Sequence, residues 1–227
     1  MRPAAGAGVS VRFSVAGMGG SLLFWLCYDQ RLMHCGVLLI MDALSALHNR
    51  VSMPRLVAPA PTREQQEALF QAALRTPDHA RLRPWRFLVV EGPALEQLGE
   101  LYHAAALASG ADPDAETTRR ARQLPLRAPM IIVAISSPKL HPKVPEHEQD
   151  MSCAVAVGNM LVAAHAMGLG AVWRTGEPAR DRVICDGLGL SAEEKIIAFV
   201  YIGQSLTPDR PVPVLDSADY FRRWPEC

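Results

Sequence analysis

The sequence has no excess charge of either sign, few cysteines and no apolar run of membrane-spanning length. Its 23 basic side chains balance 23 acidic ones, so no global field would draw it to nucleic acid or to an anionic membrane. The five cysteines are scattered without a CxxC pair, which is typical of free thiols in a reducing compartment and predicts a cytoplasmic protein. With 227 residues and 49% apolar content, the chain is long enough for one domain with a sizeable core.

The common nucleotide-binding and hydrolase motifs are also missing. No GxGxxG follows a predicted strand, and neither GxxxxGK[ST] nor GxSxG occurs. Gly168-Leu-Gly170 follows a predicted helix and is interpreted as a helix cap. A zinc site would need scattered ligands whose spacing matches no standard site, namely His141, His147, Cys153 and His165. We therefore expect any anion site to be local, and we expect no metal.

Residues 1–40 differ from the rest of the chain. They hold no acidic residue before Asp29, and residues 13–27 are apolar or small, with Arg2 and Arg12 preceding them. A targeting segment is one interpretation, although such a run falls short of the roughly 20 residues that a membrane span needs and no A-x-A-type cleavage site follows. We favour the other interpretation, in which 1–40 is a disordered leader or lies outside the functional chain, and 41–227 forms a single domain.

From Met41 onward, predicted helices and strands alternate. Helices are expected at 42–49, from the capping box at Thr62 to 76, from 93 to about 109, in a piece ending near 124, at about 148–167 and at 179–188. Strands are expected at 87–90 and 130–135, both of the type buried on two faces, and at 171–175 and 195–202. The alternation favours an α/β or α+β sheet covered by helices, and no repeat or linker marks a second domain. Four prolines after Ser205 suit a tail lying along another surface.

Three clusters pair a cation with a hydrogen-bonding or flat side chain. They are Arg50 with Ser52, Arg75 with His79, and Trp173 with Arg174. A phosphate dianion needs guanidinium forks, hydroxyls and free N–H groups, while a tricyclic ring needs apolar walls and a positive group. The sequence therefore favours an unorthodox phosphate site beside a ring site.

Several ordered motifs resemble those of the FMN-dependent nitroreductases, most closely their small bacterial "minimal" NAD(P)H nitroreductase branch. The resemblance runs from Met41 to about Gly203. It rests on segments 49–56 (NRVSMPRL), 75–79 (RTPDH), 84–87 (PWRF), 127–132 (RAPMII), 141–145 (HPKVP), 148–152 (EQDMS) and 172–176 (VWRTG).

The resemblance implies an α+β nitroreductase-like fold, with a mixed central β-sheet flanked by helices. It implies a homodimer whose C-terminal tail extends onto the partner, with FMN held noncovalently at the interface. The implied FMN phosphate site is Arg50, Val51 and Ser52, the ring site is Val172, Trp173 and Arg174, and Arg75 and His79 come from the other subunit. By the same analogy NADH or NADPH approaches the segment Val162, Ala163, Ala164, His165, Ala166 and Met167.

One position departs from the resemblance. Relatives in this branch generally have a second arginine directly after the first, where this chain has Val51. If that side chain touches phosphate in the relatives, its loss costs about 1.5–3 kcal/mol of binding free energy. We therefore expect weaker FMN binding, not its absence.

Three functions fit these residues. The first is an FMN-dependent NAD(P)H oxidoreductase that reduces nitroaromatic or quinone-like acceptors by ping-pong hydride transfer, in which the flavin carries the chemistry and no protein nucleophile is needed. The second is an FMN-binding or storage protein without significant NAD(P)H turnover. The third is a flavin-dependent enzyme of other chemistry on the same scaffold.

Overall fold

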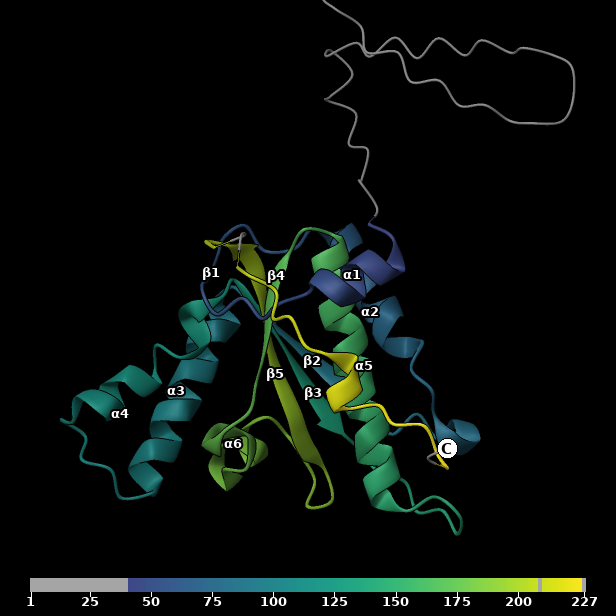
Figure 1. Cartoon of the computed structure of the whole chain (residues 1–227). Helices are drawn as coiled ribbons and strands as arrows, with labels where there is room; N and C mark the ends of the chain where they lie inside the picture. Colours follow the sequence, from purple (N-terminus) through teal and green to yellow (C-terminus); the bar gives the residue numbers. More distant parts are fainter. Residues whose placement is uncertain (1–40, 208–209, 226–227) are drawn as a thin grey trace, which may run out of the picture. The chain divides into compact units, whose positions relative to one another are not determined.

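A five-stranded sheet lies at the centre of the part of the chain that the structure describes (Figure 1). The structure is a computed structural model that describes residues 41–207 and 210–225, so the expected leader at 1–40 lies outside the described residues. The strands are β1 (Leu56–Val57), β2 (Trp85–Glu91), β3 (Met130–Ser136), β4 (Gly170–Arg174) and β5 (Lys195–Ser205). Hydrogen-bonded neighbours follow the order β1-β5-β3-β2, and β4 also pairs with β5.

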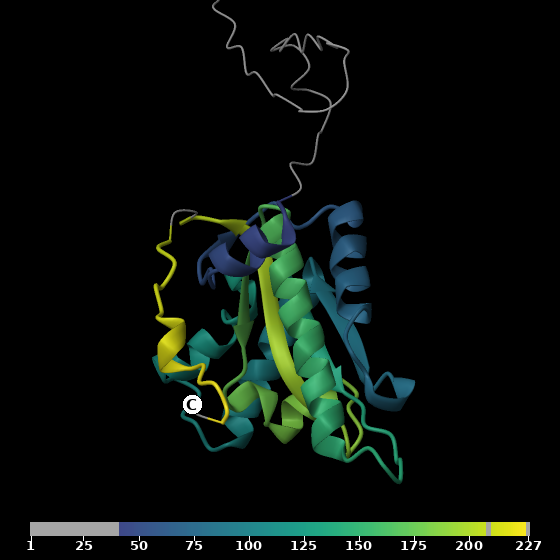
Figure 2. The ribbon, with the colours of Figure 1, turned by 45° about the vertical axis from the view of Figure 1, so that its right-hand side comes forward.

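Helices cover both faces of this sheet (Figures 1 and 2). They are α1 (Ala43–Asn49), α2 (Arg63–Leu74), α3 (Pro93–Ala108), α4 (Glu116–Ala121), α5 (Glu146–Ala166) and α6 (Arg182–Gly187), with short 3-10 turns η2 (His79–Arg81), η3 (Pro125–Arg127), η4 (Glu177–Ala179) and η5 (Ser217–Asp219). The predicted capping box is present, because Thr62 and Gln65 each accept a hydrogen bond from the other's backbone N–H. Local capping thus sets where α2 begins.

The α+β class and the central sheet flanked by helices are confirmed. Each hydrogen-bonded pair among the described strands is antiparallel, although we expected a mixed sheet. Strands β3 and β4 both run antiparallel to β5 and therefore run parallel to each other, with β5 between them. The crossover through α5 does join two parallel strands, but the insertion of β5 keeps them from being neighbours.

Two hydrophobic cores lie on opposite faces of the sheet. Successive side chains of β3 alternate between them, so Ile131 and Val133 pack with α3 and α6, while Ile132 and Ala134 pack with α2 and α5. All of β3 is buried, as its continuous apolar run predicts.

Two expectations about strands were incomplete. Strand β2 is half-buried rather than buried on both faces, and Val89 is 40% exposed, because β2 ends the sheet order and pairs only with β3. Strand β1 was expected to be loop. Its pairing with Gln204 and Ser205 at the far end of β5 arises from tertiary packing, which local propensity does not reveal.

Among the exposed apolar side chains of the described chain, three groups stand out. Leu44 and Leu47 share a face of α1 that points to solvent, while Ala46 is the residue buried there. Met151 and Val155 project from α5. The tail carries Val214 and Trp224, at 96% and 94% exposure, together with Leu215, Tyr220 and Phe221. Among the described residues, no helix combines the length and apolarity that crossing a membrane requires.

Candidate functional site

The segment after α1 lies against the start of β4. Arg50 is the C-cap of α1, and the Met53 N–H donates to the Ala171 carbonyl at 2.9 Å. Gly170 permits this close approach, because a Cβ there would lie 2.6 Å from Leu56 Cδ2 and 3.3 Å from Met53 Cβ. The predicted phosphate segment is thereby held beside the predicted ring segment.

The end of α5 reaches the same place. The imidazole of His165 is half-buried, and its Nε2 atom is buried without a hydrogen-bond partner in the described chain. Burial is the main cause that lowers the pKa of His165, and the positive charge of Arg50 lowers it further. The structure therefore brings Arg50 to the predicted nicotinamide segment 162–167 and to β4, although more than a hundred positions separate Arg50 from them in the sequence.

Arg75 and His79 lie elsewhere in the same chain. Arg75 is an exposed C-cap of α2, and His79 Nδ1 lies 2.9 Å from Glu148 Oε2 in the first turn of α5. At about 1.5 Å of rise per residue, roughly 25 Å of helix separates Glu148 from His165. Within one subunit, His79 is therefore not brought to Arg50. Arg75 precedes Thr76, whose hydroxyl accepts from Asn159 Nδ2 in the middle of α5.

The loop that carries His79 has a strained backbone. Ala80, Arg81 and Arg83 have φ of 60°, 55° and 49°, in the left-handed region that side chains with a Cβ disfavour. The Asp78 carboxylate, which accepts from the Arg83 N–H at 2.6 Å, helps to hold this conformation. Strain of this kind is concentrated at functional sites, where surrounding contacts maintain it.

Alternation along β4 sends its predicted site residues to opposite faces. Trp173 packs against the α5 core, and its Nε1–H donates to the Ile197 carbonyl at 3.1 Å. Val172 and Arg174 face the other side, where the Arg174 guanidinium lies 5.5 Å from the centroid of the Tyr201 ring. The indole of Trp173 therefore belongs mainly to the core, while Arg174 faces a cavity.

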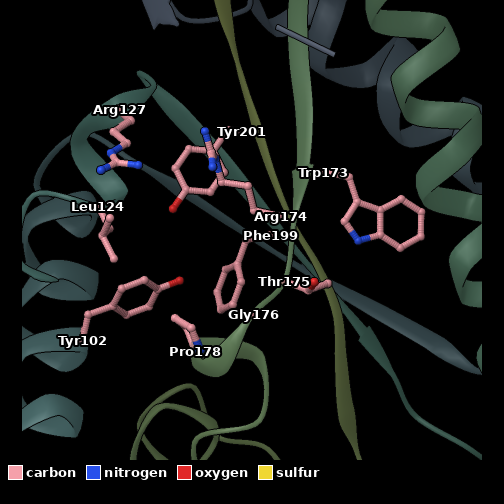
Figure 3. A pocket seen from close by; sticks show the side chains of 10 residues that line it. All are labelled: Tyr102, Leu124, Arg127, Trp173, Arg174, Thr175, Gly176, Pro178, Phe199 and Tyr201. Carbon is pink, nitrogen blue, oxygen red and sulfur yellow. The ribbon is translucent and has the colours of Figure 1, made fainter. Parts of the chain in front are cut away.

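This cavity lies on the α3 side of β4 and β5 (Figure 3). Its volume is about 390 Å³, within the roughly 300–1,000 Å³ typical of small-molecule sites. The lining includes Tyr102, Leu124, Arg127, Arg174, Phe199 and Tyr201. Figure 3 shows Trp173 pointing away from the other lining side chains, in agreement with its packing.

Cationic and phenolic groups converge on the cavity. The Nε atom of Arg174 is buried without a partner in the described structure, and Arg127 stands at the exposed rim. Burial raises the pKa of both Tyr102 and Tyr201, while Arg174 and Arg127 partly offset this rise at Tyr201. Both phenols are therefore neutral near pH 7, and the cavity carries positive charge.

Sequence reasoning named Arg174 but missed Tyr102, Arg127 and Tyr201 as candidate site residues. Tyr201 reaches Arg174 because it is the register partner of Val172 across β4 and β5, and Tyr102 comes from α3. The segment 127–132 had carried part of the resemblance, but no local signal distinguished Arg127 as a cavity residue. Over residues 41–207 and 210–225, no group of three or more His, Cys, Asp or Glu side chains is arranged to hold a metal ion.

Two solved structures share this fold. A nitroreductase-like family protein from Bacillus cereus superposes with a TM-score of 0.70 at 18% identity, covering 82% of this chain and 97% of that one. A nitroreductase with bound FMN from Bacteroides fragilis superposes with a TM-score of 0.61 at 19% identity, covering 81% and 98%. At such identities the likeness establishes the fold alone.

Sequence comparison establishes the family. The protein named "Putative NAD(P)H nitroreductase YdjA" from Escherichia coli K12 is 40% identical over 163 residues, which cover 72% of this chain and 88% of YdjA. A similarly named Haemophilus influenzae protein is 36% identical over 184 residues, or 79% of this chain and 98% of that relative. The profile of the Nitroreductase family matches residues 47–204. This chain therefore belongs to the nitroreductase family.

Proposed function

We propose that this protein is an FMN-dependent NAD(P)H oxidoreductase that reduces nitroaromatic or quinone-like acceptors by a ping-pong route. One observation carries the proposal. Arg50, the end of α5 and β4 meet through the Met53–Ala171 hydrogen bond and the effect of Arg50 on His165. These are the segments that the family resemblance assigns to phosphate, nicotinamide and flavin ring.

The residues at this place fit FMN. A guanidinium at Arg50 and the exposed hydroxyl of Ser52 can bind a phosphate, and β4, where the ring site is predicted, lies beside them. Three residue steps along β4 separate Ala171 from Arg174, or about 10 Å, so a phosphate group and a ring can be held by one run of backbone. When bound, FMN supplies the ability to accept and pass on a hydride.

The protein itself would bind and orient the flavin and place charge near it. Arg174, held over Tyr201, would supply a permanent positive charge near a ring bound at β4, and such a charge favours the reduced, electron-rich flavin. The apolar side chains of Phe199 and Leu124 exclude water from this side of β4. No group of the protein needs to form a covalent bond to substrate.

We also propose that the active form is a homodimer. His79 lies beside Glu148, roughly 25 Å of helix from the His165 end of α5 that Arg50 approaches, so a contact of both His79 and Arg50 with one FMN requires two subunits. The exposed apolar residues Met151 and Val155 suit burial between α5 helices, and the apolar tail suits a groove on the partner. The two described cysteines, Cys153 and Cys185, are free, which supports the expected cytoplasmic location.

Anaerobic spectroscopy tests the proposed function. Purified protein is expected to be yellow and to bleach when NADH or NADPH is added, and to recover its colour on adding a nitroaromatic or a quinone. A yellow protein that neither cofactor bleaches would indicate FMN storage. A colourless protein that does not quench the fluorescence of added FMN would overturn the proposal.

Replacement of Arg75 tests the contact across subunits. Arg75→Ala is expected to raise the Kd for FMN by roughly tenfold or more, because a charge-assisted contact is lost. The molar mass in solution should stay that of the dimer. An unchanged Kd would exclude the contact.

A further inference from the structure

The cavity beside Arg174 has a charge that nothing in the described chain balances. No carboxylate is among its lining residues, and no ion pair of Arg127 or Arg174 occurs within residues 41–207 and 210–225. The Nε–H of Arg174 is buried and unpaired as well. A desolvated donor of this kind is costly unless a ligand satisfies it.

The same cavity has flat walls. Tyr102 and Phe199 meet edge to face, with ring centroids 5.6 Å apart, and Tyr201 lies beneath the Arg174 guanidinium. Figure 3 shows Arg127 and Arg174 extending toward Tyr201, with the Tyr102 hydroxyl on the same side of the sheet. Stacking on Tyr201 orients the guanidinium plane and leaves its edge donors free for a planar acceptor group.

We propose that this cavity binds the electron acceptor and selects planar aromatic anions, with Arg174 and Arg127 holding a carboxylate and Tyr102, Phe199 and Leu124 contacting the ring. The proposal rests on the function proposed above and specifies its substrate class. Arg127 sits at the exposed rim and meets the carboxylate on entry, whereas Arg174 lies in the wall. A neutral acceptor of the same shape gains the wall contacts but leaves the Arg174 donor unpaired.

The site residue to replace is Arg127, because it is exposed and its loss leaves the core intact. Arg127→Met removes the rim charge and keeps an unbranched side chain. Arg180→Gln serves as the matched control, since Arg180 is exposed, caps η4 next to the cavity and does not line it.

Binding of 4-nitrobenzoate and 4-nitrobenzamide to FMN-loaded protein would be measured by calorimetry. For each protein the ratio of kcat/KM for the two acceptors would also be determined. The native protein is expected to bind the carboxylate roughly ten- to a hundredfold more tightly than the amide, and Arg127→Met should reduce this preference by about tenfold while Arg180→Gln keeps it. Equal preference in the native protein, or an equal loss in both variants, would overturn the proposal.

Fluorescence titration with FMN tests whether the planar ligand of this cavity is the electron acceptor or FMN itself. If Arg127→Met raises the Kd for FMN as much as that for 4-nitrobenzoate, the cavity belongs to the flavin and the proposal falls. Should the native protein bind no FMN, the proposed function fails by itself, and 4-nitrobenzoate is titrated into the colourless protein. Carboxylate binding that depends on Arg127 would then still support an anion site in this cavity. No such binding would overturn it.

Discussion

Glu194 connects the loop before β5 to β2 through Arg86. Its two carboxylate oxygens accept from Arg86 Nε and Nη2, each at 2.7 Å, and the side chain is only 11% exposed. The bidentate bond with Arg86 lowers the pKa of Glu194 from 4.5 to about 2. Because the folded pKa lies below the unfolded value, this stabilisation is present above pH 4.5 and is lost as the pH falls toward 2.

We therefore predict that Glu194→Gln lowers the free energy of unfolding at pH 7 by about 1.5–3 kcal/mol, because Arg86 loses a charged partner. The difference from the native protein should shrink as the pH falls below 4.5. Urea unfolding at pH 7 and at a pH below 4.5 would measure this difference in the free energy of unfolding. The neighbouring Glu193, whose carboxylate accepts from exposed Ser191, provides the control. Glu193→Gln should have a far smaller effect, and equal effects of the two variants would contradict the assignment.

His165 predicts a pH dependence of the same sign as that of Glu194, but at higher pH. Its folded pKa lies below the ordinary value of 6.5. Burial is the larger cause, and the positive charge of Arg50 is the smaller one. The unfolded chain therefore takes up a proton first, and stability falls as the pH drops through 6.5 toward the folded value. His165→Gln should show a smaller decrease in Tm between pH 7.5 and pH 5.5, measured by circular dichroism. The idea fails if both proteins lose the same Tm.

At the scale of elements, the close approach of β1, β5 and the segment before β3 depends on Gly203. A Cβ at this position would lie 2.6 Å from Pro129 Cδ and 2.9 Å from the Val57 carbonyl oxygen. Neither the proline ring nor the backbone can move aside without shifting a strand. This junction also holds the start of β4, since Gly170 is the register partner of Gly203.

Gly203→Ala is thus expected to lower the free energy of unfolding by about 1–3 kcal/mol, as overpacking does. Gly187→Ala is the comparison, because there the added Cβ meets the flexible Leu101 side chain and alanine favours the helix. Chemical denaturation should show the larger loss at Gly203. A loss at Gly187 equal to or greater than that at Gly203 would disprove the argument.

Elements with strong local signals could be predicted from the sequence. Thr62 and Gln65 define a helix start within four residues, and the apolar run at 130–135 specifies a buried strand. Strand β1 could not be predicted, because two residues become a strand only through Gln204 and Ser205. The burial of β2 was overestimated because an apolar run does not reveal whether a strand lies at a sheet edge.

At the scale of the molecule, the described chain leaves apolar surface on α5. Met151 is 61% exposed and Val155 is 46% exposed, one helical turn apart. If this surface joins two subunits, Val155→Glu should give a monomer by analytical ultracentrifugation and a weaker affinity for FMN, since Arg75 then no longer reaches the site. Leu107→Glu, at an exposed position on α3, should leave the mass of the dimer unchanged. A dimer in both variants would refute an α5 interface.

The sequence by itself determined which residues are chemically suited to the proposed cofactor site: Arg50 with Ser52, Arg174, and the loop with Arg75 and His79. Residue type and order carry that information, because charge and hydrogen-bonding capacity belong to each side chain. Tertiary structure alone decided which of these groups meet. Pairing of β4 with β5 put Tyr201 beside Arg174, and alternation turned Trp173 into the core. The roughly 25 Å of α5 between Glu148, which His79 contacts, and His165 is likewise a property of the folded helix.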